Sequence, residues 1–469
     1  MRGFRAFTVR PFLTRNIVCP IQDVLLRRPT RCEWRRLEES QWLAPTELLR
    51  LHRKKLKNLL LHARSNVPFY RRRFDAIGGD PARHDPLELL ARLPLLTKRE
   101  IRVSVQEMLW PQAPGGLFNH NTGGSTGEPL QFFFDRRRQA CDQAARIRAH
   151  RWFGVSQGDR ELFVWGSPIE TERAGRRWRD ALLNHHVLDA FHMSPSRMDG
   201  YLNSWRRYRP ACVFGYPSSL ARLVEHARSR DVDLRAPNLK AVFVTGERCY
   251  DLQRATLESE LNVPVANDYG SREGGFIAHQ CPSGRMHIMT EHVHVEIVRD
   301  GLPVPFGETG EIVITHLDAY AMPFIRYRTG DIGRRIDERC SCGRGLPLMD
   351  IVEGRTTDFI VLPDGNVKHA LSIIYPLREW KGLRQFRVSQ AADFSLTVQA
   401  VADGSLPRMC GDTLCQALGR VVDDLVPIRV EWLDELPSSP SGKFRYVESR
   451  VPTTENTIFP RKEVMDVGI

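Results

Sequence analysis

The sequence predicts an α/β protein with a large N-terminal domain, built from parallel sheets and a β-rich distorted barrel, and a small mobile α+β domain. Between residues 130 and 270, short apolar runs alternate with helical stretches, and each run ends in glycine or a polar turn. This alternation is typical of a mostly parallel sheet. From residue 287 to 335 short strands and turns replace the helical stretches. The 469 residues are enough for two or three domains.

Residues 1–115 are predicted to form a helical lead-in that is part of the large domain. Residues 1–22 carry four arginines and no acidic residue, but Pro11 and Pro20 argue against an amphipathic helix. We therefore expect a disordered or loosely docked basic arm. Apolar residues at steps of three and four over 45–74 predict a helix that is ended near Pro68. A shorter helix is expected over 86–93, and Thr97 is placed to cap the next one.

Residues 116–358 are predicted to hold the ligand-binding part of the large domain. Ligands of parallel sheets bind at the carboxyl ends of the strands, so the turns after these strands are the candidate site. A domain junction is expected at Asp358, with a small C-terminal lid domain over 359–469. The expected strands cover 161–166, 211–217, 239–245, 263–267, 292–298, 311–315 and 324–328, and the expected helices cover 136–153, 218–230 and 250–261.

Amino-acid composition limits the possible binding partners and the cellular location of the protein. No segment approaches the roughly 18 apolar residues that a membrane span needs. The net charge of +12 suits a nucleotide or CoA as well as a polyanion. Without a nucleic-acid-binding motif in the sequence, we expect no nucleic-acid partner. Ten unevenly spaced cysteines do not resemble a disulfide framework, which favours a reducing, cytoplasmic location.

A loop rich in glycine and hydroxyl residues precedes the apolar run 130–134. Glycine permits positive φ and exposes backbone N–H groups to an anion, and the Ser and Thr hydroxyls add neutral donors. An ordinary turn between strands has a similar composition, so the loop alone leaves both interpretations open. Its candidate phosphate-binding residues are Thr122, Gly123, Gly124, Ser125, Thr126 and Gly127.

Six further motifs follow this loop in the chain. The seven motifs are T-G-G-S-T-G-E-P at 122–129, G-Y-P-S-S-L at 215–220, V-T-G-E at 244–247, D-Y-G-S-R-E at 268–273, R-Y-R-T-G-D at 326–331, G-R-T-T-D at 354–358 and S-P-S-G-K at 439–443. In this order they resemble the phenylacetate–CoA ligase branch of the adenylate-forming (ANL) superfamily. The resemblance extends from about residue 45 to 450.

The resemblance implies an ATP site, because carboxylate activation must align a triphosphate, a magnesium ion, a ribose and an acyl group. The glycine-rich loop would cradle the β- and γ-phosphates. Glu273 offers a hard oxygen ligand for Mg²⁺, although a surface salt bridge with Arg272 would also explain it. Tyr269 would stack near adenine or position the acyl-adenylate. Three more residues are assigned to the nucleotide: Gly246, Glu247 and Asp268.

The remaining motif residues surround the ribose and the reacting groups. Asp331 can accept hydrogen bonds from both ribose hydroxyls, and a plain turn aspartate is the alternative. The resemblance places Arg355 near the ribose or α-phosphate and makes Asp358 the hinge. Lys443 would reach the charge that develops between the carboxylate and the α-phosphate. Without the other motifs, the loop around Lys443 would be interpreted as a solvated turn.

The acyl pocket is less well defined. It is assigned to the last residues of the strand expected over 211–217, which suit core packing equally well: Phe214, Gly215, Tyr216 and Pro217. Residues 165–186 form a long arginine-rich segment, unlike the glycine-rich stretch of the phenylacetate enzymes. The sequence has no clear CoA-binding signature.

Three cysteines and a histidine form a candidate zinc site. Cys281 and His287 lie in one turn-like segment, and Cys340 and Cys342 lie in another. Three thiols and one imidazole are a standard closed tetrahedral set for zinc. His279 could replace His287 as a ligand, and unligated side chains near the surface are the alternative.

The predicted activity is an acid–thiol ligase reaction. ATP and a small carboxylic acid give an acyl-adenylate, and CoA is the usual acceptor in the family. The alternatives are an adenylyltransferase that places AMP on a hydroxylated cofactor and acyl transfer to an amine or hydroxyl in polysaccharide or secondary-metabolite synthesis. A non-catalytic nucleotide-binding scaffold is a further alternative, against which Lys443 and Asp331 argue. We expect a monomer or a homodimer.

Overall fold

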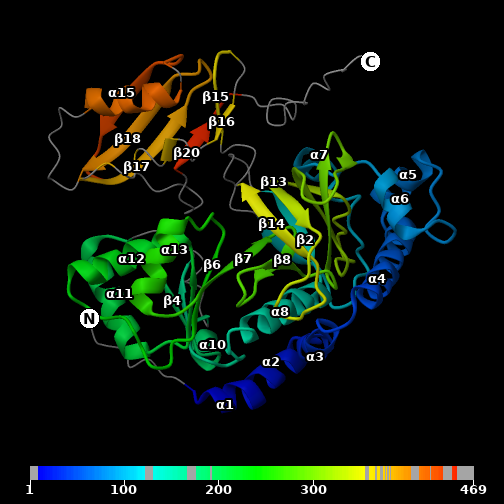
Figure 1. The fold of residues 1–469 in the computed structure, drawn as a ribbon. Helices are drawn as coiled ribbons and strands as arrows, with labels where there is room; N and C mark the ends of the chain where they lie inside the picture. The colour runs from blue at the N-terminus through cyan, green and yellow to red at the C-terminus, as the bar shows by residue number, and fades with distance from the viewer. Residues whose placement is uncertain are drawn as a thin grey trace. The chain divides into compact units, whose positions relative to one another are not determined.

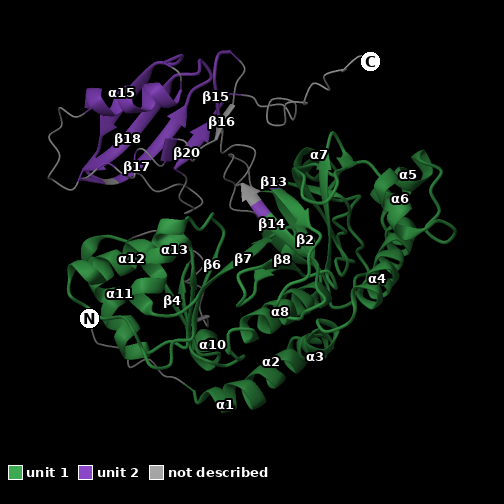
Figure 2. Cartoon of the chain, in the orientation of Figure 1, with its two compact units in different colours: residues 1–329, 333–350, 440–443 green, residues 330–332, 351–439, 444–469 purple. Residues whose placement is uncertain are grey.

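The computed structural model describes much of the chain (Figure 1). The described residues are 9–121, 130–165, 176–190, 193–353, 359–364, 367–369, 373–374, 377, 380, 382–402, 411–422, 424–436 and 446–451. They form two compact units, a large one up to residue 350 and a small one from residue 351, to which residues 330–332 also belong (Figure 2). The predicted hinge, Asp358, lies outside the described residues, so the predicted boundary stays a prediction. None of the described helices is long and apolar enough to cross a membrane.

A twelve-stranded sheet forms the centre of the large unit, and five neighbouring strands of it run parallel. The inner strands β5 and β6 have apolar runs because helices cover both faces of the sheet. This part of the sheet confirms the predicted α/β fold. In spatial order the five strands are β4 (His185–Leu188), β3 (Glu161–Val164), β5 (Cys212–Gly215), β6 (Ala241–Thr245) and β7 (Val265–Ser271).

Helices pack on both faces of this parallel part. One face is covered by α11 (Pro195–Tyr208), α12 (Pro217–Ser229) and α13 (Asp251–Leu261), whose apolar residues form one core with β3, β5 and β6. The other face is covered by α8 (Arg136–Arg151), where the His150 ring stacks on Phe243 at a centroid distance of 3.7 Å. α3 (Thr30–Ser40) packs in turn against α8. The candidate site therefore lies at the end of a sheet that is fixed from both sides.

The predicted β-rich segment is present, and its strands continue the same sheet. The continuation begins where β8 pairs antiparallel with β7. From β7 outward the order is β8 (Gly275–Gln280), β9 (Met286–Ile288), β14 (Leu348–Glu353), β13 (Tyr327–Ile336), β12 (Thr309–His316), β10 (Val293–Arg299) and β11 (Leu302–Pro303).

In its described part, from residue 9, the N-terminal arm is helical and docked, whereas we predicted a disordered or loosely docked arm. Helices α1 (Pro11–Leu13) and α2 (Cys19–Leu25) are joined by the π-helical segment Thr14–Val18. Pro11 is tolerated because it begins a helix, where its N–H is not needed. Pro20 lies further in, and the wider π-helical turn before it provides room for a ring that would clash in a regular α-helix.

The next helices follow the predicted order. Val67 is extended, so α4 (Pro45–Asn66) ends there and α5 (Pro68–Ala76) begins, as the proline predicts. After α6 (Pro86–Arg92), the predicted Thr97 cap is confirmed at α7 (Lys98–Ser104). Thr97 Oγ1 accepts from Glu100 N at 3.2 Å, and Glu100 Oε2 accepts from Thr97 N at 2.8 Å.

The small unit is an α+β structure with a four-stranded sheet. Its strand order is β19 (Ile428–Trp432), β18 (Leu396–Ala402), β17 (Leu383–Gln390) and β20 (Val447–Ser449). Helix α15 (Gly411–Val421) packs beside β19 and buries Leu414 and Leu418. A hairpin of β15 (Phe359–Val361) and β16 (Val367–His369) is tied to the sheet by buried Gln390, whose side chain bonds both backbone groups of Val361 at 3.0 and 2.7 Å.

Candidate active site and metal cluster

The carboxyl ends of β5, β6 and β7 lie at one edge of the sheet. Gly215 is level with Val244 on β6, and Thr245 is level with Asp268 on β7. The turns that follow β5 and β6 and the last residues of β7 are therefore neighbours. This arrangement brings together Tyr216, Gly246, Glu247, Asp268 and Tyr269, which the sequence assigned to the substrate and nucleotide.

Gly246 is fixed by its conformation and its neighbours. Its φ is +78°, which favours glycine, and a Cβ atom there would lie 2.9 Å from the Tyr216 ring. The Tyr216 ring stacks on Trp165 at 4.2 Å between centroids. Glu247 Oε2 accepts a hydrogen bond from Ser218 N at 3.3 Å, near the start of α12. The turn after β6 is thus held against the turn after β5.

The predicted acyl-pocket residues lie together at the end of β5, but their side chains face different parts of the protein. Phe214 faces α8, with the Arg146 guanidinium 4.9 Å from its ring centroid. Tyr216 belongs to the core under α11, α12 and α13. A side chain on Gly215 would meet Val164 O at 2.6 Å, and Pro217 begins α12. The pocket assignment stays a prediction, and Phe214 lines the face nearer α8.

Asp268 is a buried carboxyl group on β7. Burial raises its pKa to about 7, and the positive charge of Arg146 partly opposes that shift. A carboxyl group of this pKa is partly protonated at neutral pH, so it can donate a hydrogen bond as well as accept one. Asp268 faces His279 on the neighbouring strand.

Glu273 lies in the turn between β7 and β8 and is only 7% exposed. Its burial does not fit the surface salt bridge that was the alternative explanation. The hydroxyl of buried Tyr327 donates to Glu273 Oε1 at 3.2 Å. The carboxylate is therefore held in one orientation, while its other lone pairs can serve a hard cation such as Mg²⁺.

Helix α8 also fixes the backbone of this turn, a feature that sequence analysis missed. Arg138, 1% exposed, donates through Nη2 to the carbonyl oxygens of Arg272 at 2.9 Å and Glu273 at 2.6 Å. One turn further along α8, Asp142 Oδ1 accepts from Phe276 N at 3.1 Å. The only hint in the sequence was the (i, i+4) spacing of Arg138 and Asp142, which is common on solvated helices.

The Asp142 carboxylate is held by a hydrogen bond to His316 and by close packing against Gly275. Burial raises its pKa, but His316, whose Nε2 lies 3.1 Å from Asp142 Oδ1, acts together with Arg138 and the Phe276 N–H to lower it, to about 2. Asp142 is thus charged at neutral pH. A Cβ atom on Gly275 would lie 2.2 Å from Asp142 Oδ1, so only glycine fits where β8 begins. We refer to Arg138, Asp142 and His316 as the α8 brace.

Several predicted site residues lie outside the described residues. They are the loop Thr122 to Gly127, Arg355, Asp358 and Lys443. The ends of the loop are flanked by strands β1 (Phe118–Asn121) and β2 (Gln131–Phe134), which pair antiparallel. Asp331 lies in β13, among the residues that group with the small unit. The roles of these residues remain predictions.

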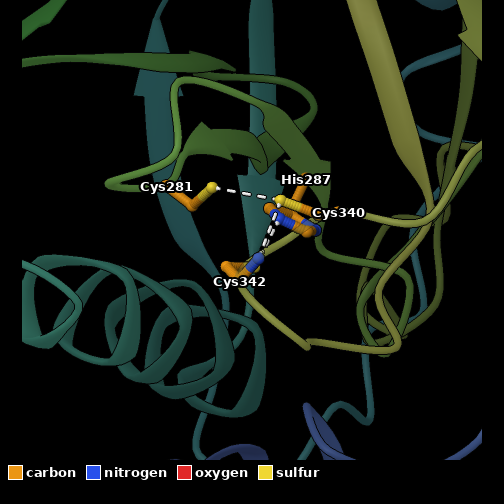
Figure 3. Close-up of side chains that lie close together, drawn as sticks. All are labelled: Cys281, His287, Cys340 and Cys342. Carbon is orange, nitrogen blue, oxygen red and sulfur yellow. Dashed lines mark hydrogen bonds between the residues drawn. The ribbon is translucent and has the colours of Figure 1, made fainter.

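The predicted cysteine–histidine cluster is assembled at the end of β8, on β9 and in the turn before β14. Figure 3 shows the four side chains converging. The Sγ atoms of Cys281 and Cys340 are 3.6 Å apart, and Cys342 Sγ lies 3.3 Å from His287 Nε2. All four ligand atoms lie within 4.8 Å of one another. Zinc bound at about 2.0–2.3 Å puts tetrahedral ligands about 3.5–3.8 Å apart, so the set fits.

The surroundings of His287 orient its imidazole and keep it neutral, as a metal ligand requires. Its Nδ1 donates to the carbonyl oxygen of Leu346 at 3.1 Å, which directs Nε2 toward the thiols. Burial lowers the pKa of His287 to about 4, so the imidazole is neutral. His279, the predicted substitute ligand, is not part of the cluster. Its ring lies among aromatic rings, including Phe276 and Phe243, and neither nitrogen has a hydrogen-bond partner among the described residues.

Comparison with solved structures identifies the class of fold. A 2-hydroxyisobutyryl-CoA ligase in its postadenylation state aligns with a TM-score of 0.69, covering 87% of this chain and 91% of that chain at 20% identity. At this identity the likeness shows the fold, which is that of the adenylate-forming ligases. No protein-family model matches the chain.

Curated relatives test the predicted resemblance to one branch of these enzymes. The chain is 29% identical over 339 residues to a phenylacetate–CoA ligase of Thermus thermophilus, covering 69% of this chain and 74% of that protein. It is 28% identical over 342 residues to the phenylacetate–CoA ligase of Escherichia coli, covering 71% and 76%. The predicted resemblance to the phenylacetate–CoA ligase branch is confirmed.

Proposed function

We propose that this protein is an ATP-dependent, AMP-forming acid–thiol ligase that joins a carboxylic acid to CoA through an acyl-adenylate. The observation that carries the proposal is the similarity to phenylacetate–CoA ligases over 69–71% of the chain. The positions of Gly246, Glu247, Asp268 and Tyr269 at neighbouring strand ends support it, because this edge of a parallel sheet is where ligands bind.

The first step forms the acyl-adenylate. A carboxylate oxygen attacks the α-phosphorus of ATP, and the bond from that phosphorus to the pyrophosphate oxygen breaks. Glu273 would hold Mg²⁺, which neutralises phosphate charge when it is bound. Lys443 stabilises the charge that develops between the carboxylate and the α-phosphate. The glycine-rich loop 122–127 holds the β- and γ-phosphates until pyrophosphate leaves.

The second step transfers the acyl group. The small domain turns about Asp358, which removes Lys443 from the site and admits the acceptor. The thiol of CoA, losing its proton, attacks the acyl carbon, and AMP leaves with the electrons of the broken bond. The products are an acyl- or aryl-CoA thioester and AMP.

Pyrophosphate exchange tests this function. Labelled pyrophosphate is expected to enter ATP only when a suitable carboxylic acid from a panel is present, because only then does the reversible first step occur. CoA should then convert the enzyme-bound adenylate to a thioester, detectable by mass. Exchange that is independent of any acid, or AMP found on a hydroxylated cofactor, would instead identify an adenylyltransferase.

A structural zinc ion at Cys281, His287, Cys340 and Cys342 is part of the proposal. The closed set of three sulfurs and one nitrogen, and the carbonyl that orients His287, support it. The cluster ties the end of β8 to the turn before β14, so its role would be to stabilise the large unit. Burial raises the pKa of the Cys340 thiol to about 11, so zinc binding would release a proton there.

We predict one zinc ion per purified chain and nearly none in Cys340→Ser. The loss should also lower the free energy of unfolding by several kcal/mol, since structural zinc binding contributes directly to folding. Metal content is measured by mass spectrometry and stability by thermal unfolding. Cys32→Ser, at an exposed free cysteine, is the matched control and should retain zinc. Zinc retained at full occupancy in Cys340→Ser would disprove the assignment.

The proposal also includes the cellular location of the enzyme. The nine cysteines that the structure describes are all free, which supports the predicted reducing, cytoplasmic location. The choice between monomer and homodimer stays a prediction.

A further inference from the structure

The helical arm, residues 11–25, carries large apolar side chains that are exposed to solvent. Their exposed fractions are 70% for Phe12, 48% for Ile17, 53% for Ile21, 77% for Val24 and 75% for Leu25. We call these five residues the arm face. Exposed apolar surface of this kind commonly marks a site of interaction with a protein or a membrane.

The arm face is directed outward because the opposite side of the arm is fixed to the large unit. Thr14 and Cys19 are buried, and Thr14 Oγ1 donates to Leu182 O at 3.2 Å. Arg15 donates to Gln157 O at 2.9 Å and pairs with Asp159 at 3.2 Å. The arm is therefore an ordered helix about 22 Å long, with one anchored side and one apolar side. Figure 1 shows α1, α2 and α3 following one another along an edge of the large unit.

The surroundings of the arm face are strongly basic. The described part of this region, residues 9–36, contains seven arginines and two acidic residues. Arg10, Arg27, Arg31 and Arg35 are exposed. Both acidic residues are engaged, since Asp23 Oδ1 accepts from Thr30 Oγ1 at 2.9 Å and Glu33 pairs with Arg36 at 2.9 Å. A partner of this surface must therefore supply negative charge beside an apolar region.

The positive charge around the arm face favours one possible partner over another. A second copy of the chain packed face to face would place the arginine-rich surfaces against each other, which is unfavourable. An anionic bilayer supplies phosphates for the guanidinium groups and an apolar layer for the arm face. An exposed tryptophan, Trp178 of α10 (Arg176–Leu182), lies one helical turn before Leu182, whose carbonyl contacts the arm. Tryptophan is enriched at membrane interfaces.

We propose that the arm face docks this protein on an anionic membrane surface. The helical arm lies in the plane of the interface, with its apolar side chains at the boundary between headgroups and acyl chains and its arginines on lipid phosphates. A single helix of this kind binds reversibly. This inference does not depend on the ligase reaction, so either can fail without the other.

Vesicle co-sedimentation of the full chain tests the proposal. The protein should sediment with phosphatidylcholine vesicles that contain phosphatidylglycerol and remain largely soluble with phosphatidylcholine alone. Binding should weaken as salt rises, because the charge attraction is screened. The triple change Phe12→Ser, Val24→Ser and Leu25→Ser should reduce partitioning by about tenfold or more, since three large apolar side chains lose their burial.

Two controls separate docking from general effects. Val103→Ser with Leu302→Ser removes apolar side chains that are 78% and 71% exposed on other elements, and it should leave binding unchanged. Arg31→Gln with Arg35→Gln should weaken binding while the arm face stays intact. Thermal unfolding shows that each variant is folded. Equal binding of the triple variant, or no binding to anionic vesicles, would overturn the proposal. So would a dimer that the triple variant abolishes without any vesicle binding.

Discussion

Lys443→Ala is expected to lower acid-dependent pyrophosphate exchange by about 10²–10³-fold, the usual effect of losing one group that stabilises charge in a transition state. The lysine belongs to the S-P-S-G-K motif at 439–443. In the proposed first step, negative charge builds on the oxygen atoms between the carboxylate and the α-phosphate. A single ammonium group at that point acts on the transition state more than on bound ATP, so kcat should fall more than the KM for ATP rises.

Measuring the second half-reaction tests the role of Lys443 more specifically. When acyl-adenylate is supplied directly, transfer to CoA should be nearly unchanged in Lys443→Ala, because the proposed domain motion removes the lysine before the thiol attacks. Arg429→Ala is a matched control, since Arg429 is an exposed cation of the small unit, paired with Glu431 on its own strand. Equal losses in both half-reactions would contradict the two-step role and indicate that Lys443 supports folding or binding of the nucleotide instead.

The parallel part of the fold could be predicted because it depends on local patterns. The inner strands β5 and β6 are apolar along almost their whole length, and the turns after β5 and β6 and the last residues of β7 carry glycine and polar residues. The Thr97 cap depends on two residues three positions apart, so it could also be predicted. The arm could not, because the π-helical turn that makes room for Pro20 has no simple sequence pattern.

The site shows the same division between local and distant interactions. Cysteine spacing indicated the metal cluster, but His279 and His287 are directly opposed on β8 and β9, and only their side-chain environments separate them. The α8 brace was missed because Arg138 acts on carbonyl groups more than 130 positions away, at 272 and 273. Every residue type has a backbone carbonyl group, so these hydrogen bonds do not restrict the residues at positions 272 and 273. They could therefore not be predicted from the sequence.

The α8 brace leads to the second large effect. Arg138→Lys is expected to weaken Mg²⁺ binding and lower kcat by about 10–100-fold, the usual cost of removing a partner that orients a metal ligand. Both hydrogen bonds come from Nη2, and a lysine side chain is one bond shorter, so its ammonium group cannot reach Arg272 O and Glu273 O from the same position. The Glu273 turn would then lose part of its anchor, while Tyr327 still holds the carboxylate.

Metal titration distinguishes this positioning role from a general loss of stability. The Mg²⁺ concentration for half-maximal exchange should rise in Arg138→Lys, and the affinity for ATP in the presence of Mg²⁺, measured by calorimetry, should fall toward the affinity without metal. Arg137→Lys is the matched control, because Arg137 is the next residue on α8 and is half-exposed, and its ion pair with Asp318 can be kept by a lysine. If Arg138→Lys lowered thermal stability while the Mg²⁺ requirement stayed the same, Arg138 would be a core residue and the orientation of Glu273 would depend on Tyr327 alone.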